Sequence, residues 1–584
     1  MILLLKIFES FKIIDFPTAY IMAFTGAWFL VFLVTVVFVK PKNKDVYRIV
    51  GAIPVIHFLV FFFFNYTEGD FNLGFGRFIW FLIAAFVYAV AGIVIANKEK
   101  VIRHVVITGI LVFITFALSV FYISGISHYS RFTNYSHMNY EQSMAALIDE
   151  IEGHYILSDH KNIDYDALRA EYIPLAAQAD AAHDELAYAQ AVASLCYEFH
   201  DGHLSAFVID PQLRNDLVVS MLGNDYGFSM LRTDDGDVVA VLTDETSAAY
   251  ELGIHDGTII TGWGGFDIDE ALSNVSCITP CWPVDAFPDA RNEEMMRPVF
   301  LAGNGGDTVS VRFIDDDGNE TEVTLNSIGS YYDRYMEATA PFTGKVRDEF
   351  GYSEMLNDHC GYICIPIEEY ETFGDIEAAL TDDYPAVREL LISRIDQMID
   401  QGMDRLIIDA RGNDGGLDIL ASSVVTLFTT EEIRTNSGFR SGDEIVQSRY
   451  WNWTVPADGR YSDIPVVLLV NAGTASAGDI LTYNLSLCPN VTVMGLATTW
   501  GCAQGVPQTA LMSGGTIRVR YSIMATLDED GNIYIDGGED RVSDIQLDVR
   551  IPLDMNTINE IYGQDSDYPL EYAVEWLDRL GYPN

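Results

Sequence analysis

Basic side chains are scarce in this sequence. Its 584 residues include 34 lysines and arginines against 84 aspartates and glutamates, which gives a formal net charge of −50 at pH 7. A chain this acidic repels nucleic acid and anionic membrane surfaces, so we expect no nucleic acid partner. Lysine is missing altogether after Lys345, which removes one common general base from the C-terminal part of the chain.

Cysteine is also scarce, with seven residues, all of them after residue 190. So few thiols in so long a chain exclude a disulfide scaffold. Cys277 and Cys281 are close enough in sequence to close a small loop, and whether they do is left open. Cys360 and Cys364 have a spacing that fits one strand, where their thiols would lie too far apart to bond. No histidine clusters with these cysteines in the sequence, so we expect neither a metal site nor a cofactor.

Long apolar runs are confined to the first part of the chain. Four of them occur, at about 18–39, 49–64, 78–96 and 105–125, and a bilayer-spanning helix needs about 20 apolar residues. We therefore expect residues 1–127 to form four transmembrane helices. The loops after the first and third runs are rich in lysine and arginine, which predicts that they are cytoplasmic. This predicts a multi-pass cell-membrane protein whose remaining residues lie outside the cytoplasm.

The remaining residues divide into three predicted parts. Residues 128–215 have apolar positions at helical spacing, and residues 216–330 contain short alternating strands. The stretch "SAAYELGIHDGTIITGWGG" in this second part resembles the helix-turn-strand corner of a PDZ domain, a type of domain that binds an extended peptide by strand addition. Residues 331–584 alternate strands with helices, which predicts an α/β core with a mostly parallel sheet.

Two turns of this α/β part carry candidate chemistry. "NAGTASAGD" places Ser476 among small residues directly before a predicted helix, and "DARGNDGGLD" contains Gly415 and Gly416. A serine before a helix is often only an N-cap. A nucleophilic serine would also need an oxyanion hole of backbone donors, which a glycine turn can supply.

The order of five motifs resembles the C-terminal processing peptidases, or tail-specific proteases, and their tricorn-like relatives. These motifs are "HDGHLS", the PDZ-like segment, "DARGNDGGLD", "LLVNAGTASAGD" and "GVPQTALMSGGTIRVR". The resemblance implies a ClpP/crotonase-like peptidase core with a helical cap and an inserted PDZ-like domain. It also implies that Ser476 is the nucleophile and that Gly415 or Gly416, with the N–H of Ala477, binds the oxyanion.

The sequence departs from this family at the general base. Many members carry a lysine after the serine, whereas this chain has "TTWGCAQG" with Cys502 in that place. Histidine is the best substitute by its pKa. "HDGHLS" resembles the histidine segment of the tricorn-like branch, which implies His203 as the base. Glu539 is the nearest match to that branch's orienting acid, with Asp540 and Asp201 as alternatives. The other histidines beyond residue 190 are His200, the second candidate, His255 and His359.

We therefore expect a membrane-anchored serine endopeptidase that cleaves extracytoplasmic proteins or peptides. Ser476 would attack the scissile carbonyl and His203 would take its proton. Two alternatives stay open: a catalytically inactive, membrane-anchored PDZ-type peptide-binding or sensor protein, and a serine hydrolase acting on a non-peptide ester. The sequence does not give the oligomeric state.

Overall fold

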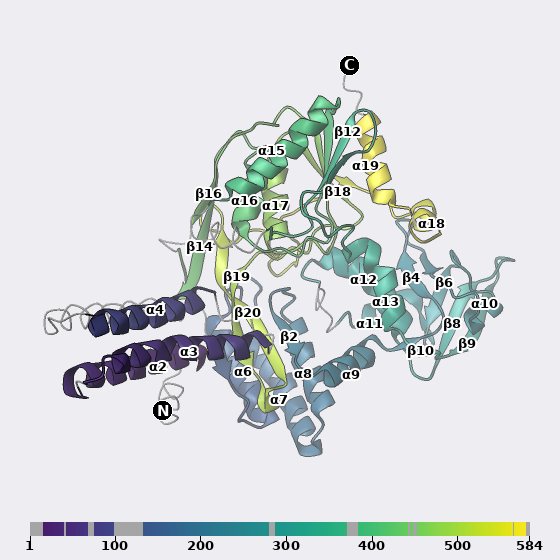
Figure 1. Cartoon of the computed structure of the whole chain (residues 1–584). Coiled ribbons are helices and arrows are strands. Elements are labelled where there is room, and N and C mark those ends of the chain that lie inside the picture. Colours follow the sequence, from purple (N-terminus) through teal and green to yellow (C-terminus); the bar gives the residue numbers. More distant parts are fainter. Residues whose placement is uncertain are drawn as a thin grey trace. The chain divides into compact units, whose positions relative to one another are not determined.

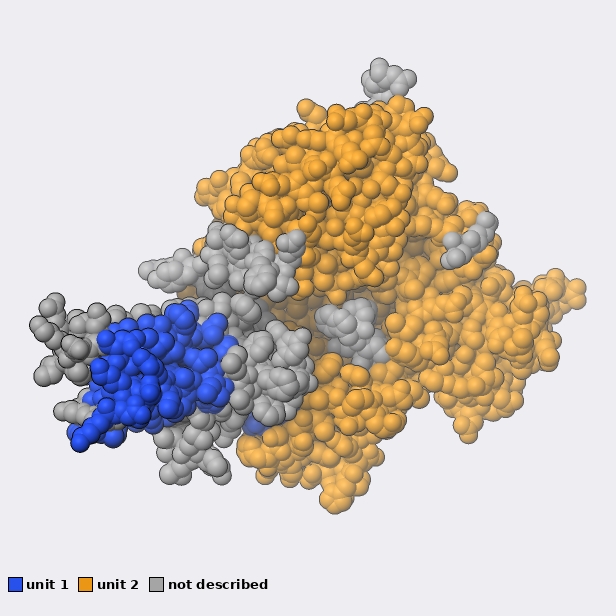
Figure 2. Space-filling view, viewed as in Figure 1, with its two compact units in different colours: residues 1–134, 508–511 blue, residues 135–507, 512–584 orange. Residues whose placement is uncertain are grey.

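A computed structural model describes most of the chain (Figure 1). The described residues are 16–39, 42–67, 75–97, 132–278, 287–370, 383–441, 444–447, 452–563 and 566–579. The chain forms two compact units, coloured separately in Figure 2: residues 1–134 with 508–511, and residues 135–507 with 512–584. The predicted boundaries after residues 127, 215 and 330 stay predictions.

The first unit is mainly helical. Helices α3 and α4 approach closely at two glycines, since a Cβ on Gly51 would lie 3.1 Å from the Cα of Gly92. The elements of this unit are α2 (Phe16–Val34), the π-helix η1 (Thr35–Val39), α3 (Asp45–Thr67), α4 (Phe75–Asn97) and β1 (Phe132–Asn134), which pairs with residues 509–511.

The prediction of a four-helix transmembrane region is wrong. None of the helices in the described part of the chain combines the length and the apolar content that crossing a membrane requires. The first apolar run passes from α2 directly into the adjoining π-helix η1. The run at 105–125 lies outside the described residues.

The second unit begins with a layer of helices whose starts are capped by side chains. Asn139, Asp164 and Asp184 each accept a hydrogen bond from a backbone N–H of the first turn that follows. The elements are α6 (Tyr140–His154), α7 (Tyr165–Ala182), α8 (Glu185–Tyr197), β2 (Ser205–Val208) and α9 (Pro211–Leu222).

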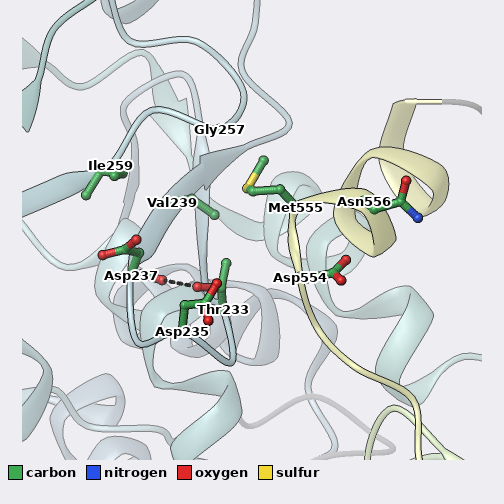
Figure 3. A pocket seen from close by; sticks show the side chains of 9 residues that line it. All are labelled: Thr233, Asp235, Asp237, Val239, Gly257, Ile259, Asp554, Met555 and Asn556. Carbon is green, nitrogen blue, oxygen red and sulfur yellow. Dashed lines mark hydrogen bonds between the residues drawn. The ribbon is translucent and has the colours of Figure 1, made fainter. Parts of the chain in front are cut away.

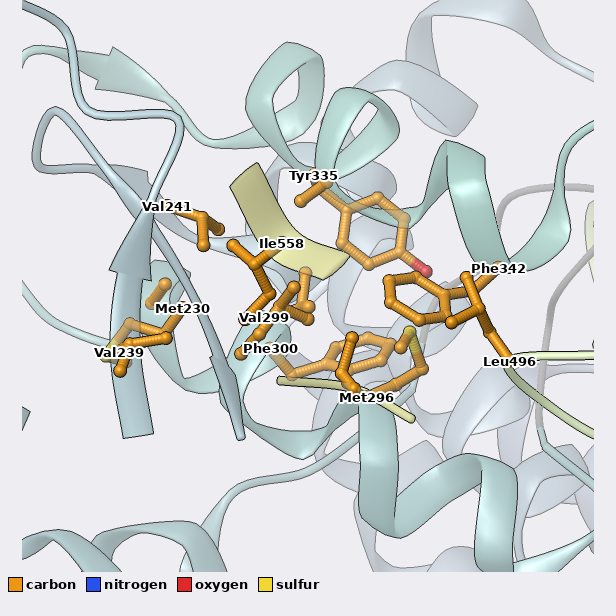
Figure 4. Close-up of a cluster of buried hydrophobic side chains, with 14 of the residues drawn as sticks. Met230, Val239, Val241, Met296, Val299, Phe300, Tyr335, Phe342, Leu496 and Ile558 are labelled. Atoms are coloured by element: carbon orange, nitrogen blue, oxygen red, sulfur yellow. The ribbon is translucent and has the colours of Figure 1, made fainter. Parts of the chain in front are cut away.

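A β-rich segment follows, built around one apolar core. Figure 4 shows Met230, Val299 and Phe300 of this core packed with Phe342 and Ile558, so later helices share it. Its elements are β3 (Asn224–Asp225), β4 (Ser229–Arg232), β5 (Val238–Val241), α10 (Ala248–Glu251), β6 (Ile260–Trp263), β7 (Phe266–Asp267), α11 (Ile268–Asn274), α12 (Ala290–Gly303), β8 (Thr308–Ile314), β9 (Glu320–Asn326), β10 (Gly329–Ser330) and α13 (Tyr332–Thr343).

The six-stranded sheet of the α/β part is mixed. Its strands run in the order β11-β12-β13-β17-β18-β21, and β11 at one edge is antiparallel to its neighbour while the others are parallel. The strands are β11 (Ser353–Met355), β12 (Cys360–Cys364), β13 (Arg405–Asp409), β17 (Val466–Leu469), β18 (Val491–Gly495) and β21 (Val549–Arg550). The helices are α15 (Pro385–Asp400), α16 (Asp418–Val425), α17 (Ala477–Ser486), α18 (Met555–Gly563) and α19 (Tyr568–Arg579).

The two candidate turns leave this sheet at the same edge. Strands β13 and β17 are parallel neighbours, so their C-terminal ends meet, and the turns 410–417 and 470–476 follow directly. A second sheet contains β14 (Ile433–Ser441), β15 (Glu444–Gln447), β16 (Trp453–Val455), β19 (Gly505–Leu511) and β20 (Ile517–Leu527). Strand β2 pairs with β20, which fixes the residues just before β2, including His203.

Candidate active site

Ser476 stands at the junction between the turn after β17 and helix α17. Its neighbours Ala475 and Ala477 are buried, whereas Ser476 is partly exposed. The backbone of Ser476 has φ 58° and ψ −119°, a conformation that residues other than glycine rarely adopt. Strain of this kind persists only where surrounding contacts enforce it, and it presents the serine Oγ outward at a strand-to-helix turn.

The structure brings His203 to this serine. His203 Nε2 lies 3.2 Å from Ser476 Oγ, although the two residues are 273 positions apart in the chain. Gly202 makes the approach possible, because a Cβ there would lie 2.9 Å from both Cys502 Sγ and the ring of Trp500. A serine within hydrogen-bond distance of an imidazole nitrogen is the arrangement that a nucleophile and its general base require.

Cys502, the residue in the place of the family lysine, contacts the other ring nitrogen. Its Sγ lies 3.3 Å from His203 Nδ1. For Nε2 to accept the serine proton, Nδ1 must carry a hydrogen, which then points at this sulfur. Sulfur is a weak acceptor, so the contact orients the ring without the charge that an acid would supply.

Of the three candidate acids, Asp201 is the one beside the histidine. Asp201 is 1% exposed, and its carboxylate accepts hydrogen bonds from the backbone N–H of His203 at 2.8 Å and from the Tyr155 hydroxyl at 2.7 Å. Glu539 and Asp540 are both exposed. The described contacts therefore place Asp201 at the site and leave Glu539 at the surface.

The electrostatics of the site favour a neutral imidazole. Burial lowers the pKa of His203, the nearby Asp201 raises it, and Arg520 lowers it further, with a net shift downward. Burial, together with Asp201, Asp536 and Asp479, raises the pKa of the Cys502 thiol well above its usual value. Near neutral pH His203 is thus available as a base and Cys502 is a thiol.

We predict how the acidic limb of the pH–rate profile depends on these groups. Since His203 must be neutral, kcat/KM falls as the pH drops through its pKa, and the midpoint lies below 6.5 because the net shift is downward. Asp201→Asn lowers the midpoint further by removing the negative charge that favours the imidazolium. The exposed control Glu539→Gln leaves it unchanged. A midpoint that moves with Glu539→Gln and not with Asp201→Asn would assign the orienting role to Glu539.

The glycine turn lies against the serine. A Cβ on Gly415 would be 2.6 Å from the Cβ of Ser476 and 3.0 Å from the backbone nitrogen of Ala477. Gly415 donates its own N–H to Asn413 Oδ1 at 3.0 Å. The backbone of Glu368 bonds to this turn twice: its N–H donates to the carbonyl of Gly415, and its carbonyl accepts from the N–H of Leu417. These two bonds leave the N–H of Gly416 unused.

Gly416 and Ala477 are therefore the better candidates for a pair of oxyanion donors. Ala477 is the first residue of α17, where N–H groups have no acceptor within the helix and the dipole favours negative charge. Glu368 also holds the glycine turn through its side chain, because its Oε1 accepts a hydrogen bond from Asn413 Nδ2 at 2.9 Å. Burial raises the pKa of the Glu368 carboxyl to about 8. A neutral Glu368 adds no charge that would repel the oxyanion.

Asp479 ties the serine turn to the cysteine segment. Its fully buried carboxylate accepts backbone hydrogen bonds from Ser476 and Gly501 at 3.0 Å and from Cys502 at 3.1 Å. Burial outweighs these donors and raises the pKa of Asp479 to about 7. One carboxylate thus positions both the nucleophile and the residue that contacts the base.

We predict a large effect for Asp479→Asn. The amide keeps one acceptor oxygen and turns an NH₂ group toward a backbone N–H, and an unsatisfied buried donor costs about 1–3 kcal/mol. We expect a lower free energy of unfolding in urea and a lower kcat. The control is Asp414→Asn, which removes only the partly exposed ion pair with Lys345 and should cost at most about 1 kcal/mol. Equal effects of the two variants would contradict the positioning role of Asp479.

The remaining histidine candidates lie elsewhere. His200 packs its ring against Tyr197, and burial lowers its pKa to about 3. His255 packs against Tyr250 and His359 lies 3.3 Å from Asp404.

Cys360 and Cys364 are free buried thiols, and Cys281 lies outside the described residues. The cavity in Figure 3, about 380 Å³, is lined by residues of the β-rich segment and by Asp554, Met555 and Asn556, and by none of the site residues.

Sequence reasoning missed Asp479, Glu368 and the contact made by Cys502. A signal existed for Asp479, because Ser476 and Asp479 have the spacing of a capping box, in which the third helical residue binds back to the N-cap N–H. No signal existed for Glu368, whose role depends on a bridge between distant segments.

Comparison with known proteins agrees with this geometry. Residues 361–543 match the model of Peptidase family S41. The carboxy-terminal processing protease CtpA of Bacillus subtilis (strain 168) is 31% identical over 185 residues, which cover 31% of this chain and 34% of that protein. A probable CtpA-like serine protease of Staphylococcus epidermidis (strain ATCC 12228) is 27% identical over 219 residues, 37% of this chain and 43% of that protein. The matches thus span less than half the length of these relatives.

The similarity to solved structures is lower. Mature CPAF complexed with lactacystin aligns with 72% of this chain and 95% of its own, at 12% identity and a TM-score of 0.46. The photosystem II D1 C-terminal processing protease aligns with 74% of this chain and 98% of its own, at 15% identity and a TM-score of 0.32. The resemblance to the C-terminal processing proteases is confirmed, and residues 361–543 of this chain match peptidase family S41.

Proposed function

We propose that the whole chain is a serine endopeptidase of the tail-specific type. The observation that carries this proposal is the 3.2 Å contact between His203 Nε2 and Ser476 Oγ beside a glycine turn. His203 takes the proton of Ser476 as its Oγ attacks the scissile carbonyl and returns that proton to the leaving amine. The N–H groups of Gly416 and Ala477 stabilise the oxyanion.

Hydrolysis by the purified full chain tests this proposal. We expect a mixture of peptides and an unfolded protein to be cleaved, with the products identified by mass spectrometry, and no cleavage by Ser476→Ala. Absence of peptide cleavage by the wild type would contradict the proposal. In that case, cleavage of simple esters would indicate a non-peptide hydrolase, and peptide binding alone would indicate an inactive binder.

We also propose that residues 216–330 are a PDZ-like domain that reports peptide binding to the active site. Asn292, in the first turn of α12, donates to the carbonyls of Thr498 at 3.1 Å and Thr499 at 2.8 Å, close to Cys502. Asp289, which caps α12, accepts the N–H of Ser543 at 3.0 Å. A peptide that shifts α12 would move the segment that carries Cys502.

A stimulation assay tests this coupling. A peptide that resists cleavage is titrated while hydrolysis of a separate reporter is followed. We expect the wild type to be stimulated and Asn292→Ala to bind the peptide without stimulation, since two buried hydrogen bonds are lost. Stimulation that is unchanged in Asn292→Ala would exclude this route. The location of the peptidase outside the cytoplasm stays a prediction.

A further inference from the structure

Three potential metal ligands meet behind the candidate catalytic histidine. One oxygen of Asp201, one ring nitrogen of His203 and Sγ of Cys502 all lie within 4.8 Å of one another, and Nδ1 is the nitrogen in contact with Sγ. The cysteine comes from a segment 299 residues after the histidine, so the sequence alone does not show the cluster. Among the described residues it is the one group of at least three histidine, cysteine or acidic side chains so arranged.

The geometry is close to that of a tetrahedral zinc site. With Zn–N near 2.0 Å and Zn–S near 2.3 Å, the nitrogen and sulfur of such a site lie about 3.5 Å apart. His203 Nδ1 and Cys502 Sγ are 3.3 Å apart. One imidazole, one thiolate and one carboxylate leave a fourth position for water, and this mixed donor set suits Zn²⁺ better than the oxygen-seeking Mg²⁺ or Ca²⁺.

The surroundings hold the ligands in place. Tyr155 and the backbone N–H of His203 both donate to the Asp201 carboxylate, and Asp479 fixes the backbone of Cys502. Such outer hydrogen bonds orient metal ligands.

The surrounding charge favours a cation. Asp536 is buried, lies near both Asp201 and Cys502, and its Oδ1 has no hydrogen-bond partner among the described residues. Two cations oppose it: Lys161, whose Nζ is held by the carbonyls of His200 and Gly537, and Arg520, which lowers the pKa of His203. Three buried acids, Asp201, Asp479 and Asp536, thus face two basic side chains around the cluster.

We propose that Asp201, His203 and Cys502 form an inhibitory site for a divalent transition metal ion, with zinc the best fit. On binding, Cys502 releases its thiol proton to solvent and coordinates as thiolate. The metal takes the lone pair of Nδ1, and the hydrogen that Nδ1 carries in the active form moves to Nε2. A histidine in this state cannot accept the proton of Ser476. The inhibition rests on the proposed peptidase function, whereas the metal site does not.

Cobalt titration of the full chain tests the site without any turnover. We expect Co²⁺ to produce a thiolate-to-cobalt charge-transfer band in the near ultraviolet, displaced by Zn²⁺. The band should be lost in Cys502→Ser and in His203→Ala. It should persist in Cys488→Ser, which alters another buried free thiol, and in Ser476→Ala, which leaves all three ligands in place. Circular dichroism verifies that each variant is folded. Absence of the band in the wild type, or its persistence in folded Cys502→Ser, would overturn the proposal.

Two further measurements test the hydrogen bond from Tyr155 to Asp201 and the inhibition of hydrolysis by Zn²⁺. Tyr155→Phe removes the hydroxyl from Asp201 and should weaken Zn²⁺ binding by about 10- to 100-fold. Zn²⁺ should inhibit hydrolysis reversibly, with activity restored by a chelator. A wild type that binds Co²⁺ through Cys502 but hydrolyses nothing would refute the peptidase and keep the metal site. A wild type that hydrolyses peptides but gives no cobalt band would refute the metal site and keep the peptidase.

Discussion

Replacing His203 with alanine is expected to reduce kcat/KM by about 10⁴- to 10⁶-fold, close to the effect of Ser476→Ala. The physical reason is that a serine hydroxyl is a weak nucleophile near neutral pH, and Nε2 of His203 is the base placed 3.2 Å from it. Because the two residues act as one unit, the double variant should lose little beyond either single one.

The matched control is His200→Ala, three positions earlier in the same motif. His200 packs against Tyr197 and lies 3.9 Å from Glu293, without contact to Ser476. We expect its kcat/KM to change by less than about tenfold when equal amounts of folded protein are compared. A large loss in His200→Ala with an active His203→Ala would move the base to His200.

Replacing Gly415 with alanine is expected to disable the site by displacing the nucleophile. The new Cβ would meet the Cβ of Ser476 at 2.6 Å and the carbonyl of Ala475 at 2.9 Å, and neither can move without distorting the strained serine turn. A displacement of about 1 Å from the reactive geometry costs about 100-fold in rate. The residue also has φ +93°, which costs a further 1–2 kcal/mol or so in stability.

Gly531→Ala separates the two effects of this substitution. Gly531 has φ +87°, and a Cβ there would meet nothing within 4 Å. We expect this control to lose stability in urea by a similar backbone penalty and to keep its kcat. If Gly415→Ala kept the wild-type kcat as well, the glycine turn would have no part in the site.

The sequence allowed the Ser476 turn and the glycine turn to be predicted because both are local. Each consists of a buried strand followed by small residues, and parallel strands place such turns at one edge of a sheet. His203 was reached through the resemblance of "HDGHLS" to a family motif, together with the missing lysine. Its contact with Ser476 depends on the pairing of β2 with β20, which hydropathy does not reveal.

The acid and the membrane region show where sequence reasoning fails. Glu539 fits the family pattern by order along the chain, but order does not determine burial, and Glu539 is exposed while Asp201 is buried beside His203. The apolar runs before residue 128 resemble spans by hydropathy, yet no described helix has the length and apolar content to cross a membrane. Cys502 was noticed only as a missing lysine, because its partner lies 299 residues away.

Covalent labelling with a fluorophosphonate, mapped by mass spectrometry, tests the Ser476–His203 pair most directly. We expect a single modified residue, Ser476, in the wild type, and a labelling rate in His203→Ala reduced by at least about 100-fold, because general base catalysis contributes about 10²- to 10⁴-fold. Labelling at another residue, or an undiminished rate in folded His203→Ala, would contradict the assignment of this pair.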